Sequence, residues 1–305
     1  MAPANVDFSS LLTPALFHQV LKNRLPWPKE KPIDFKELTK EPDGTQKKEF
    51  REIAWPVLKA LSTLGVDSVP DMMQFLPSPE SEDFPEQALG LQLLLDQGSR
   101  ALFEGIDIRY TYDYFQHVAR KFAQQLLDLP SQLRIDSKKR WMDEQGASFD
   151  YWLMVRLWLI APVVHSEALA DHELAQQMNE EVRVEVEKFS SKTDPYRAQR
   201  AELAVDIYAF GKMYRIGPPM ENGPQMHEWF FWMWTVLDVH KPIIDKFGKY
   251  PYQDVAKGRV STEEEREWSI VFENGVDKSD SDVAKKIRED VLKGRWTPLG
   301  GKDET

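Results

Sequence analysis

The stretch Tyr151–Val164, YWLMVRLWLIAPVV, is the most apolar part of the 305-residue chain. Nearly every residue from Phe149 to Leu159 is apolar, which is typical of a helix buried on all sides. Arg156 and Pro162 interrupt the stretch, and it is too short to cross a bilayer. We therefore expect a buried core helix here and no membrane partner.

Helical periodicity continues on both sides of this segment. The expected helices cover residues 86–103, 110–129, 174–189, 196–214, 227–247 with a bend at Pro242, and a last one ending at Phe272. A capping box, in which Glu264 reaches back to Ser261, is expected to open that last helix. No alternating strand pattern and no glycine-rich phosphate loop is visible. The sequence therefore predicts an all-α fold of antiparallel helical pairs around one extended core.

Clusters of proline and glycine divide the chain into three parts. Prolines crowd the first 90 residues, so short helices and extended connections are expected there. We predict a proline-rich N-terminal segment over 1–85 packed on the main domain, a helical core domain over 86–272, and a charged C-terminal helix and tail over 273–305. Within the core domain, the run 217–224 marks a sharp break.

Charge and cysteine content exclude several classes of protein. With 39 basic and 50 acidic residues the net charge is −11, which argues against generic polyanion binding and against a DNA partner. The absence of cysteine excludes disulfides, thiolate metal sites and cysteine nucleophiles. His165 and His172 are seven apart without an HExxH pattern, so we expect no metal and no cofactor. Residues 1–25 show no secretory signal, and a cytoplasmic protein is expected.

Asp96, Gln97 and Arg100 form the first candidate site. On a helix, Asp96 and Arg100 share one face and can pair. An exposed pair of this kind contributes less than ~1 kcal/mol and would be ordinary surface structure. Because Leu94 and Leu95 precede the pair, it could instead border a substrate pocket. Both interpretations stay open at this point.

His165, Ser166 and Glu167 follow directly after the apolar helix and form the second candidate site. They could supply a base, a nucleophile and a cation-binding group. Neighbouring residues on a helix diverge by about 100°, so these three cannot form a triad with one another. The alternative is a helix start, in which Ser166 caps and Glu167 favours the helix N-terminus.

The third candidate site runs from His240 to Arg259. His240 lies on the inner face of its expected helix, and Gly248 suits a left-handed C-cap. Lys246, Lys249 and Arg259 then surround a tight turn that could bind a phosphate or a carboxylate. A structural turn with solvated lysines is the alternative.

Together, these segments resemble the helical family catalogued as domain-of-unknown-function family 924. Its bacterial pattern contains "LLDQ…R", "P…HSE" and "H…I…RFGRFPHRN…LGR.ST.EE". The matching residues, in the same order, are Leu94, Leu95, Asp96, Gln97, Arg100, Pro162, His165, Ser166, Glu167, His240, Phe247, Gly248, Pro251, Gly258, Arg259, Ser261, Thr262, Glu264 and Glu265. The resemblance covers roughly residues 86–272 and implies a tetratricopeptide-like stack of helices, although no 34-residue repeat is visible.

The sequence departs from the bacterial pattern in the third segment. Lys246, Lys249, Tyr252, Gln253 and Asp254 stand where that pattern has two arginines and then His-Arg-Asn. An anion site built by this turn would be weakened.

The diverged pattern is similar to fungal members, for which the resemblance implies an arginine-containing cyclodipeptide synthase. Such an enzyme condenses arginyl-tRNA and a second aminoacyl-tRNA into a diketopiperazine. Catalysis would then fall to His165 or His240 as base, with Ser166 as acyl acceptor. Arginine binding would fall to Asp96, Gln97, Arg100, Glu167, Trp158 and Trp232. The tRNA surface would be Lys138, Lys139, Arg140, Lys246, Lys249 and Arg259.

Two other classes of function remain open. One is a non-catalytic helical scaffold that binds a peptide or protein partner in an aromatic groove. The other is a small-molecule hydrolase that uses His165 and Ser166. Convergence of Asp96, His165, Glu167 and His240 in one cavity would favour an enzyme, whereas a long groove with these residues held in ion pairs would favour a scaffold.

Overall fold

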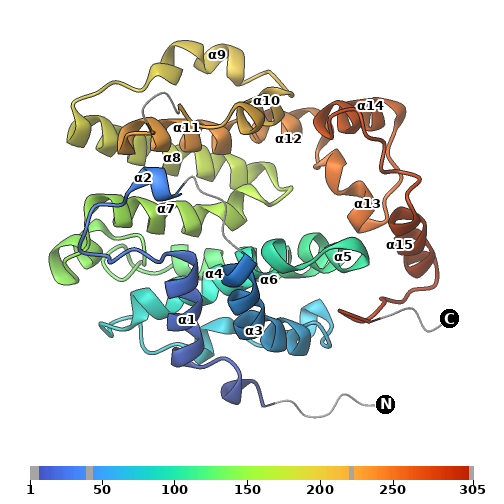
Figure 1. The fold of residues 1–305 in the computed structure, drawn as a ribbon, viewed down its shortest axis with the longest axis horizontal. Helices are drawn as coiled ribbons and strands as arrows, with labels where there is room; N and C mark the ends of the chain where they lie inside the picture. The colour runs from blue at the N-terminus through green and yellow to red at the C-terminus, as the bar shows by residue number, and fades with distance from the viewer. Residues whose placement is uncertain (1–6, 39–43, 220–222, 302–305) are drawn as a thin grey trace.

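The structure is a computed structural model that describes residues 7–38, 44–219 and 223–301. Within these ranges every regular element is a helix and no strand occurs, which confirms the predicted all-α class (Figure 1). Three stretches named above fall partly outside the described residues: the N-terminal segment over 1–85, the break over 217–224 and the C-terminal tail.

The first half of the chain supplies the lower layers of Figure 1, except for α2 (Phe35–Leu38), which lies higher and packs through Phe35 on α11 (Met226–Asp238). Its helices are α1 (Pro14–Arg24), α2 (Phe35–Leu38), α3 (Gly44–Leu61), α4 (Phe84–Leu102), α5 (Ile108–Tyr110) and α6 (Gln116–Leu127). Short 3-10 turns lie at Phe8–Ser10, Val66–Ser68, Met72–Phe75 and Gly105–Asp107, and a π-helical turn over Thr111–Phe115 joins α5 to α6.

The second half continues the stack upward and then descends along one side. Its helices are α7 (Phe149–Val164), α8 (Leu169–Ser190), α9 (Arg200–Leu203), α10 (Ala209–Ile216), α11 (Met226–Asp238), α12 (Lys241–Phe247), α13 (Asp254–Lys257), α14 (Glu263–Phe272) and α15 (Asp282–Leu292). A π-helical turn covers Lys139–Glu144, and 3-10 turns cover Pro195–Gln199 and Pro251–Gln253.

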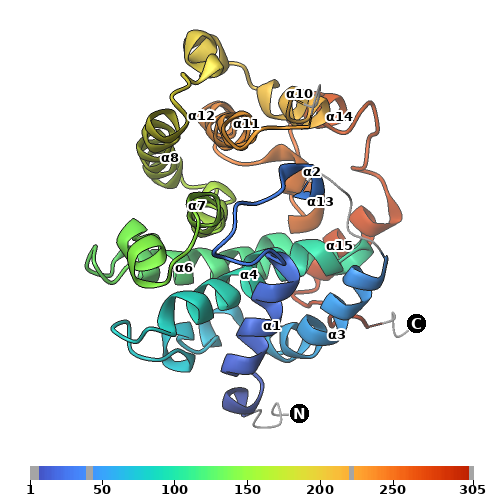
Figure 2. The same ribbon diagram turned by 60° about the vertical axis from the view of Figure 1, so that its left-hand side comes forward.

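The predicted buried helix is α7, which packs against α4, α6, α8 and α11. Fifteen of its sixteen residues are buried, as an all-round apolar helix requires. A connection of only four residues joins α7 to α8, and the two helices pack side by side, so they are antiparallel. Figure 2 shows α11 beside α8 in the layer above.

The N-terminal helices pack tightly on α4. A Cβ atom placed on Gly90 of α4 would lie 2.2 Å from the carbonyl oxygen of Phe17 in α1, so only glycine permits this approach. One buried cluster extends from Leu12 to Leu299, and so the first helices share their core with the rest of the described chain. The domain boundaries after residues 85 and 272 stay predictions.

Several predicted elements have different bounds in the structure. The helix expected over 227–247 is two helices, because Pro242 occupies the first turn of α12 and the chain bends at Val239 and His240. The helix expected over 196–214 is a 3-10 turn followed by α9 and α10. The N-terminal segment contains an 18-residue helix, α3, with Pro56 inside it. The capping box pairs Thr262 with Glu265, one residue later than predicted.

Candidate functional site

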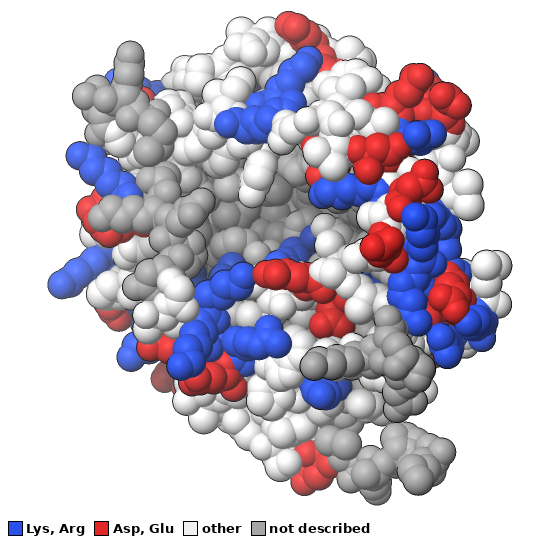
Figure 3. All heavy atoms as spheres, turned by 45° about the vertical axis from the view of Figure 1, so that its right-hand side comes forward, with Lys and Arg blue, Asp and Glu red and all other residues white. Residues whose placement is uncertain are grey.

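The three motif segments, although far apart in sequence, meet on one side of the molecule. The C-terminal part of α4 carries Asp96, and the C-terminal end of α7 carries His165. The segment containing α12 and α13 closes over both. Figure 3 turns the α13–α15 side forward and shows a face with a deep hollow near its centre, bordered by basic and acidic side chains.

A carboxylate–imidazole pair lies at the centre of this cluster. Asp96 Oδ1 is 2.9 Å from His165 Nδ1, and Gln97 Nε2 donates to Asp96 Oδ2 over 2.5 Å. The Asp96 side chain is 2% exposed, whereas that of His165 is 19% exposed. The histidine is therefore held from behind by a buried carboxylate and keeps a part that solvent or a ligand can reach.

The charges around the pair determine which form each partner takes. Burial opposes ionisation of Asp96, but His165, Arg100 and Gln97 outweigh it and hold the pKa of the carboxyl well below its usual range. Burial, reinforced by the Arg100 charge, lowers the pKa of His165 below 6.5. At neutral pH the pair is thus a carboxylate and a neutral imidazole.

The geometry assigns the proton within the imidazole. A carboxylate can only accept, so His165 Nδ1 carries the hydrogen and Nε2 carries the lone pair. Within the described chain, Nε2 has no hydrogen-bond partner. A neutral imidazole oriented in this way by a buried carboxylate is the arrangement of a general base.

Arg100 and Tyr112 form one wall beside the pair. Arg100 Nε is 3.6 Å from Asp96 Oδ1, and its guanidinium lies 5.4 Å from the centre of the Tyr112 ring. Tyr112 projects from the π-helical turn between α5 and α6. The π turn is thus part of what places an aromatic face next to Arg100.

Glu167 is fixed by a second network. Its carboxylate accepts two hydrogen bonds from Arg259, at 2.8 and 2.9 Å, one from Lys257 at 2.9 Å, and one from the Tyr250 amide at 2.9 Å. Burial alone would raise the pKa of Glu167, but these partners lower it to about 2. The carboxylate fork predicted for a substrate guanidinium is therefore filled by Arg259 of the chain itself.

Ser166 has a local structural role here. Its side chain is buried, its hydroxyl oxygen accepts from the Ala168 amide over 3.0 Å, and its carbonyl accepts from His172 Nε2 over 2.9 Å. Ser166 therefore shapes the turn between α7 and α8, close to the capping alternative considered above, although α8 begins only at Leu169.

His240 is buried between rings. Its ring lies 3.9 Å from that of Phe210 and 5.9 Å from that of Tyr250, and its Nδ1 donates to the Val236 carbonyl over 2.8 Å. Burial and the neighbouring His165 lower the pKa of His240 to about 3. His240 thus borders the cluster as a neutral group without direct contact to Asp96.

The basic residues predicted to bind tRNA do not form one surface. Lys249 pairs with Asp254 at 2.9 Å and with Glu265 at 3.1 Å. Lys246 pairs with Glu264 at 2.6 Å and Arg259 pairs with Glu167. The weakened anion site expected at this turn is thus neutralised by its own acidic neighbours.

The stretch 138–140 lies elsewhere, on the opposite edge of Figure 1 from α13. Lys138 pairs with Glu185 at 2.7 Å, Lys139 pairs with Glu144, and Arg140 is buried against backbone carbonyls. The expectation that these residues join the Lys246–Arg259 group in one patch is wrong, because separate elements at opposite sides of the stack carry them.

The two tryptophans predicted to line the substrate pocket have different positions. Trp158 is seven residues before His165 on α7, so both lie on the same helical face. Trp232, in α11, donates to the Met213 carbonyl and packs near Trp229. Trp158 thus lies about two helical turns before His165 on α7, whereas Trp232 packs between α10 and α11.

Sequence reasoning missed four residues of the site. Arg24 of α1, in the proline-rich segment, acts on Asp96 electrostatically. Tyr112, Tyr250 and Lys257 complete the walls. Tyr250 and Lys257 lie inside the third motif segment and could have been suspected, but no pattern around Arg24 points to a site 72 residues away.

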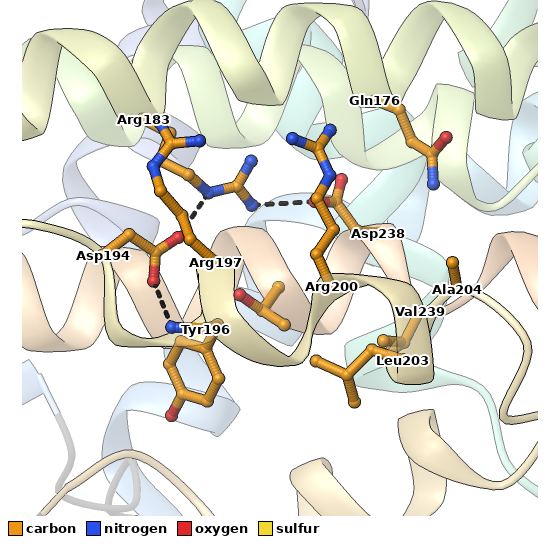
Figure 4. Close-up of a pocket in the computed structure, with 11 residues that line it drawn as sticks. Gln176, Arg183, Asp194, Tyr196, Arg197, Arg200, Leu203, Ala204, Asp238 and Val239 are labelled. Atoms are coloured by element: carbon orange, nitrogen blue, oxygen red, sulfur yellow. Dashed lines mark hydrogen bonds and ion pairs between the residues drawn. The ribbon is translucent and has the colours of Figure 1, made fainter.

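A separate cavity of about 110 Å³ lies between α8, the 195–199 turn and α11 (Figure 4). Arg183 reaches across it to Asp194 at 2.6 Å and to Asp238 at 2.8 Å. Arg197 and Arg200 both pair with Glu180. The charged residues around this cavity pair with one another, and the cavity lies where these elements pack together. None of the motif residues lines it.

Neither a metal cluster nor a membrane span is found in the described parts of the chain. No three histidine or acidic side chains there are grouped to hold a metal ion. No described helix combines the length and apolar character needed to cross a bilayer.

Comparison with known proteins gives one match. A family model described as "Bacterial protein of unknown function (DUF924)" matches residues 72–270. No curated protein and no solved structure matches the chain. The matched region contains the Asp96–His165 pair and the Glu167–Arg259 network.

Proposed function

The chain belongs to the DUF924 family, and from that premise we propose that it is an enzyme that transfers an acyl group to an amine, with His165 as the general base. The observation that carries the proposal is the 2.9 Å contact between buried Asp96 and partly exposed His165. A base with a pKa lowered below 6.5 is largely unprotonated at neutral pH and ready to accept a proton.

The specific reaction we propose is the condensation of arginyl-tRNA with a second aminoacyl-tRNA to an arginine-containing cyclodipeptide. His165 Nε2 removes a proton from the α-amine of one aminoacyl group, and the amine attacks the ester carbonyl of the other. The carbon–oxygen bond to the tRNA breaks, and the proton passes to the leaving hydroxyl. A second attack of the same kind closes the ring and releases the other tRNA.

Direct attack by the amine is favoured over an acyl-enzyme. Ser166, the predicted acyl acceptor, is buried and its oxygen accepts a backbone hydrogen bond. Its side chain diverges from that of His165, and among the described residues no histidine hydrogen-bonds to its hydroxyl. The developing negative charge on the carbonyl oxygen would instead be stabilised by a donor next to the pair, and Arg100, which is partly exposed, can supply it.

A scaffold is the second candidate, and one observation favours it. A groove of about 900 Å³ runs along α8 and is bordered by Lys138, Trp152, Glu181 and Lys188. None of the motif residues lines this groove, so peptide binding there would leave the Asp96–His165 pair unexplained.

The test uses the purified full chain. With arginyl-tRNA and a second aminoacyl-tRNA, we expect a diketopiperazine by mass spectrometry, and ribonuclease treatment should abolish it. Product formed from free arginine, a second amino acid and ATP after ribonuclease treatment would replace this proposal with an ordinary ligase. A lack of product under every condition, together with a co-purifying protein, would support the scaffold.

A further inference from the structure

Two arginines that interact with Asp96 have a side-chain nitrogen without a hydrogen-bond partner. Within the described chain, Arg24 Nε and Arg100 Nε are buried and have no hydrogen-bond acceptor. An unpaired buried donor is unfavourable, and in a native structure such a group calls for an explanation such as a bound ion or water.

Arg24 is the more unusual of the two. It is half-buried at the C-terminal end of α1, and its side chain makes no ion pair and no hydrogen bond with a described residue. Its only contact of note is a stack 5.3 Å above the Phe50 ring. Burial lowers the pKa of Arg24, and the charge of Asp96 partly offsets that effect, which places the guanidinium within electrostatic range of the pair.

Arg100 approaches the pair from the other side. Its contact with Asp96, at 3.6 Å, is longer than a hydrogen bond, whereas His165 and Gln97 each hydrogen-bond to one of the carboxylate oxygens. Arg100 Nη2 donates a hydrogen bond to the neutral Gln116 side chain over 3.3 Å. Arg100 is 20% exposed and so keeps donors available to a ligand.

The local charge is positive. Arg24 and Arg100 contribute +2, Asp96 contributes −1 and neutral His165 contributes nothing, which leaves +1 beside the proposed base. A protein with a total charge of −11 has no general attraction for anions, so this excess is confined to the site. One negatively charged ligand group would balance it.

We propose that Arg24 and Arg100 bind an oxyanion of the substrate beside His165. Guanidinium groups present paired donors that match phosphate and carboxylate oxygens. The inference rests on the proposed function in that it places the substrate at the same pair. It changes the expectation for this site, since the group bound there is negative and is not the guanidinium of an arginine.

Two sources of the oxyanion are distinguishable. In the proposed reaction the group is the phosphate of the terminal adenosine of the tRNA, and in a small-molecule enzyme it is the carboxylate of a free acid. Titration calorimetry of the full chain with adenosine 5′-monophosphate, with adenosine and with acetate separates the two. Binding of the monophosphate but not of adenosine assigns a phosphate, whereas binding of acetate alone assigns a carboxylate.

Substitutions test the residues. Arg24→Gln and Arg100→Gln should each weaken binding of the preferred anion by about tenfold, the effect of losing one charge-assisted contact. Arg51→Gln is the matched control, because Arg51 also stacks on a ring, 4.0 Å from that of Trp55, but on the exposed face of α3. Arg24→Lys keeps the positive charge and serves as the control for misfolding. It should lose less affinity for the anion than Arg24→Gln.

The inference is overturned if none of the three probes binds saturably, or if Arg24→Gln binds the anion as tightly as the wild type. These outcomes are independent of catalysis. An inactive protein that still binds the anion through Arg24 would refute the proposed acyl transfer and leave the anion site standing. An active protein with no anion binding would do the reverse.

Discussion

At the scale of single residues, the proposed chemistry depends on the protonation of His165. Burial and Arg100 lower its pKa below 6.5, and the base must be neutral to accept a proton. The rate should therefore rise with pH through the pKa of His165 and level off above it. A pH–rate profile for the wild type, with tRNA stability checked separately, measures this. A rate that increases as the pH falls would assign His165 the role of an acid.

Asp96 orients that base, so its replacement should slow the reaction without removing the histidine. Asp96→Asn can donate to Nδ1 and favours the wrong tautomer, and triads with this change lose about 10²–10⁴ in rate. The control is Asp67→Asn, at an exposed position in a turn. An Asp96→Asn variant that is folded by circular dichroism and fully active would remove the pair from the mechanism.

His240 affects stability in acid. Its pKa is about 3 in the folded chain against 6.5 in the unfolded chain, so the unfolded state takes up the proton first as the pH falls. Its contribution is constant above pH 6.5 and is lost progressively between pH 6.5 and 3, by about 2–3 kcal/mol at about pH 4.5. In urea titrations, His240→Asn should lose less free energy of unfolding between about pH 7.5 and 4.5 than the wild type. Equal losses in both proteins would show that His240 is protonated without penalty.

At the scale of elements, Glu167 and Arg259 connect the end of α7 to the segment after α13. Two parallel hydrogen bonds between charged groups predict a coupling energy of about 1.5–3 kcal/mol in a double-mutant cycle with Glu167→Gln and Arg259→Gln. The surface pair Lys241–Asp245 should couple by less than ~1 kcal/mol. Additive losses at Glu167 and Arg259 would mean that the connection is held by other contacts.

The lowered pKa of Glu167 sets the pH below which this coupling is lost. The pKa of Glu167 falls from 4.5 to about 2 on folding, so its contribution is complete above pH 4.5 and is lost as the pH falls toward 2. Glu167 thus stabilises the turn that carries His165, which is the structural role weighed against substrate binding in the sequence.

The helices were predictable where their pattern was long and unbroken. The segment around Tyr151–Val164 could be predicted to lie in the core, because a helix that is apolar on all faces is stable only when other helices cover it. Ends and breaks were less predictable. Pro242 marks a bend in one helix or the start of a second equally well, and packing of α12 on α8 decides for the second. Ser261 and Thr262 are both good caps, and only the backbone geometry selects Thr262.

At the scale of the whole molecule, the sequence predicted the members of the site better than their pairings. Asp96 and His165 were both predicted as site residues, but their hydrogen bond was not. That hydrogen bond depends on the packing of α4 against α7. Glu167 and Arg259 were assigned to different ligands and instead bind each other. Arg24 was not predicted, because its position depends on the packing of α1 against α4, which includes a close approach at Gly90.

The charge of the whole chain bears on the proposed substrate. With a net charge of −11 and with the predicted basic groups paired and separated, tRNA could be held only through a few phosphates. Binding should then depend weakly on salt, with a slope set by those few contacts. The arginines beside Asp96 are the basic groups best placed to make one of them.

The most direct test of the central claim compares small molecules in cells that express the wild type, His165→Asn or the control Asp67→Asn. If His165 is the base of a cyclodipeptide synthase, mass spectrometry will find an arginine-containing diketopiperazine in the wild-type and control cells. The His165→Asn cells, with equal amounts of folded protein, will lack it. An undiminished product in His165→Asn cells, or no new arginine-containing product in wild-type cells, would contradict the account.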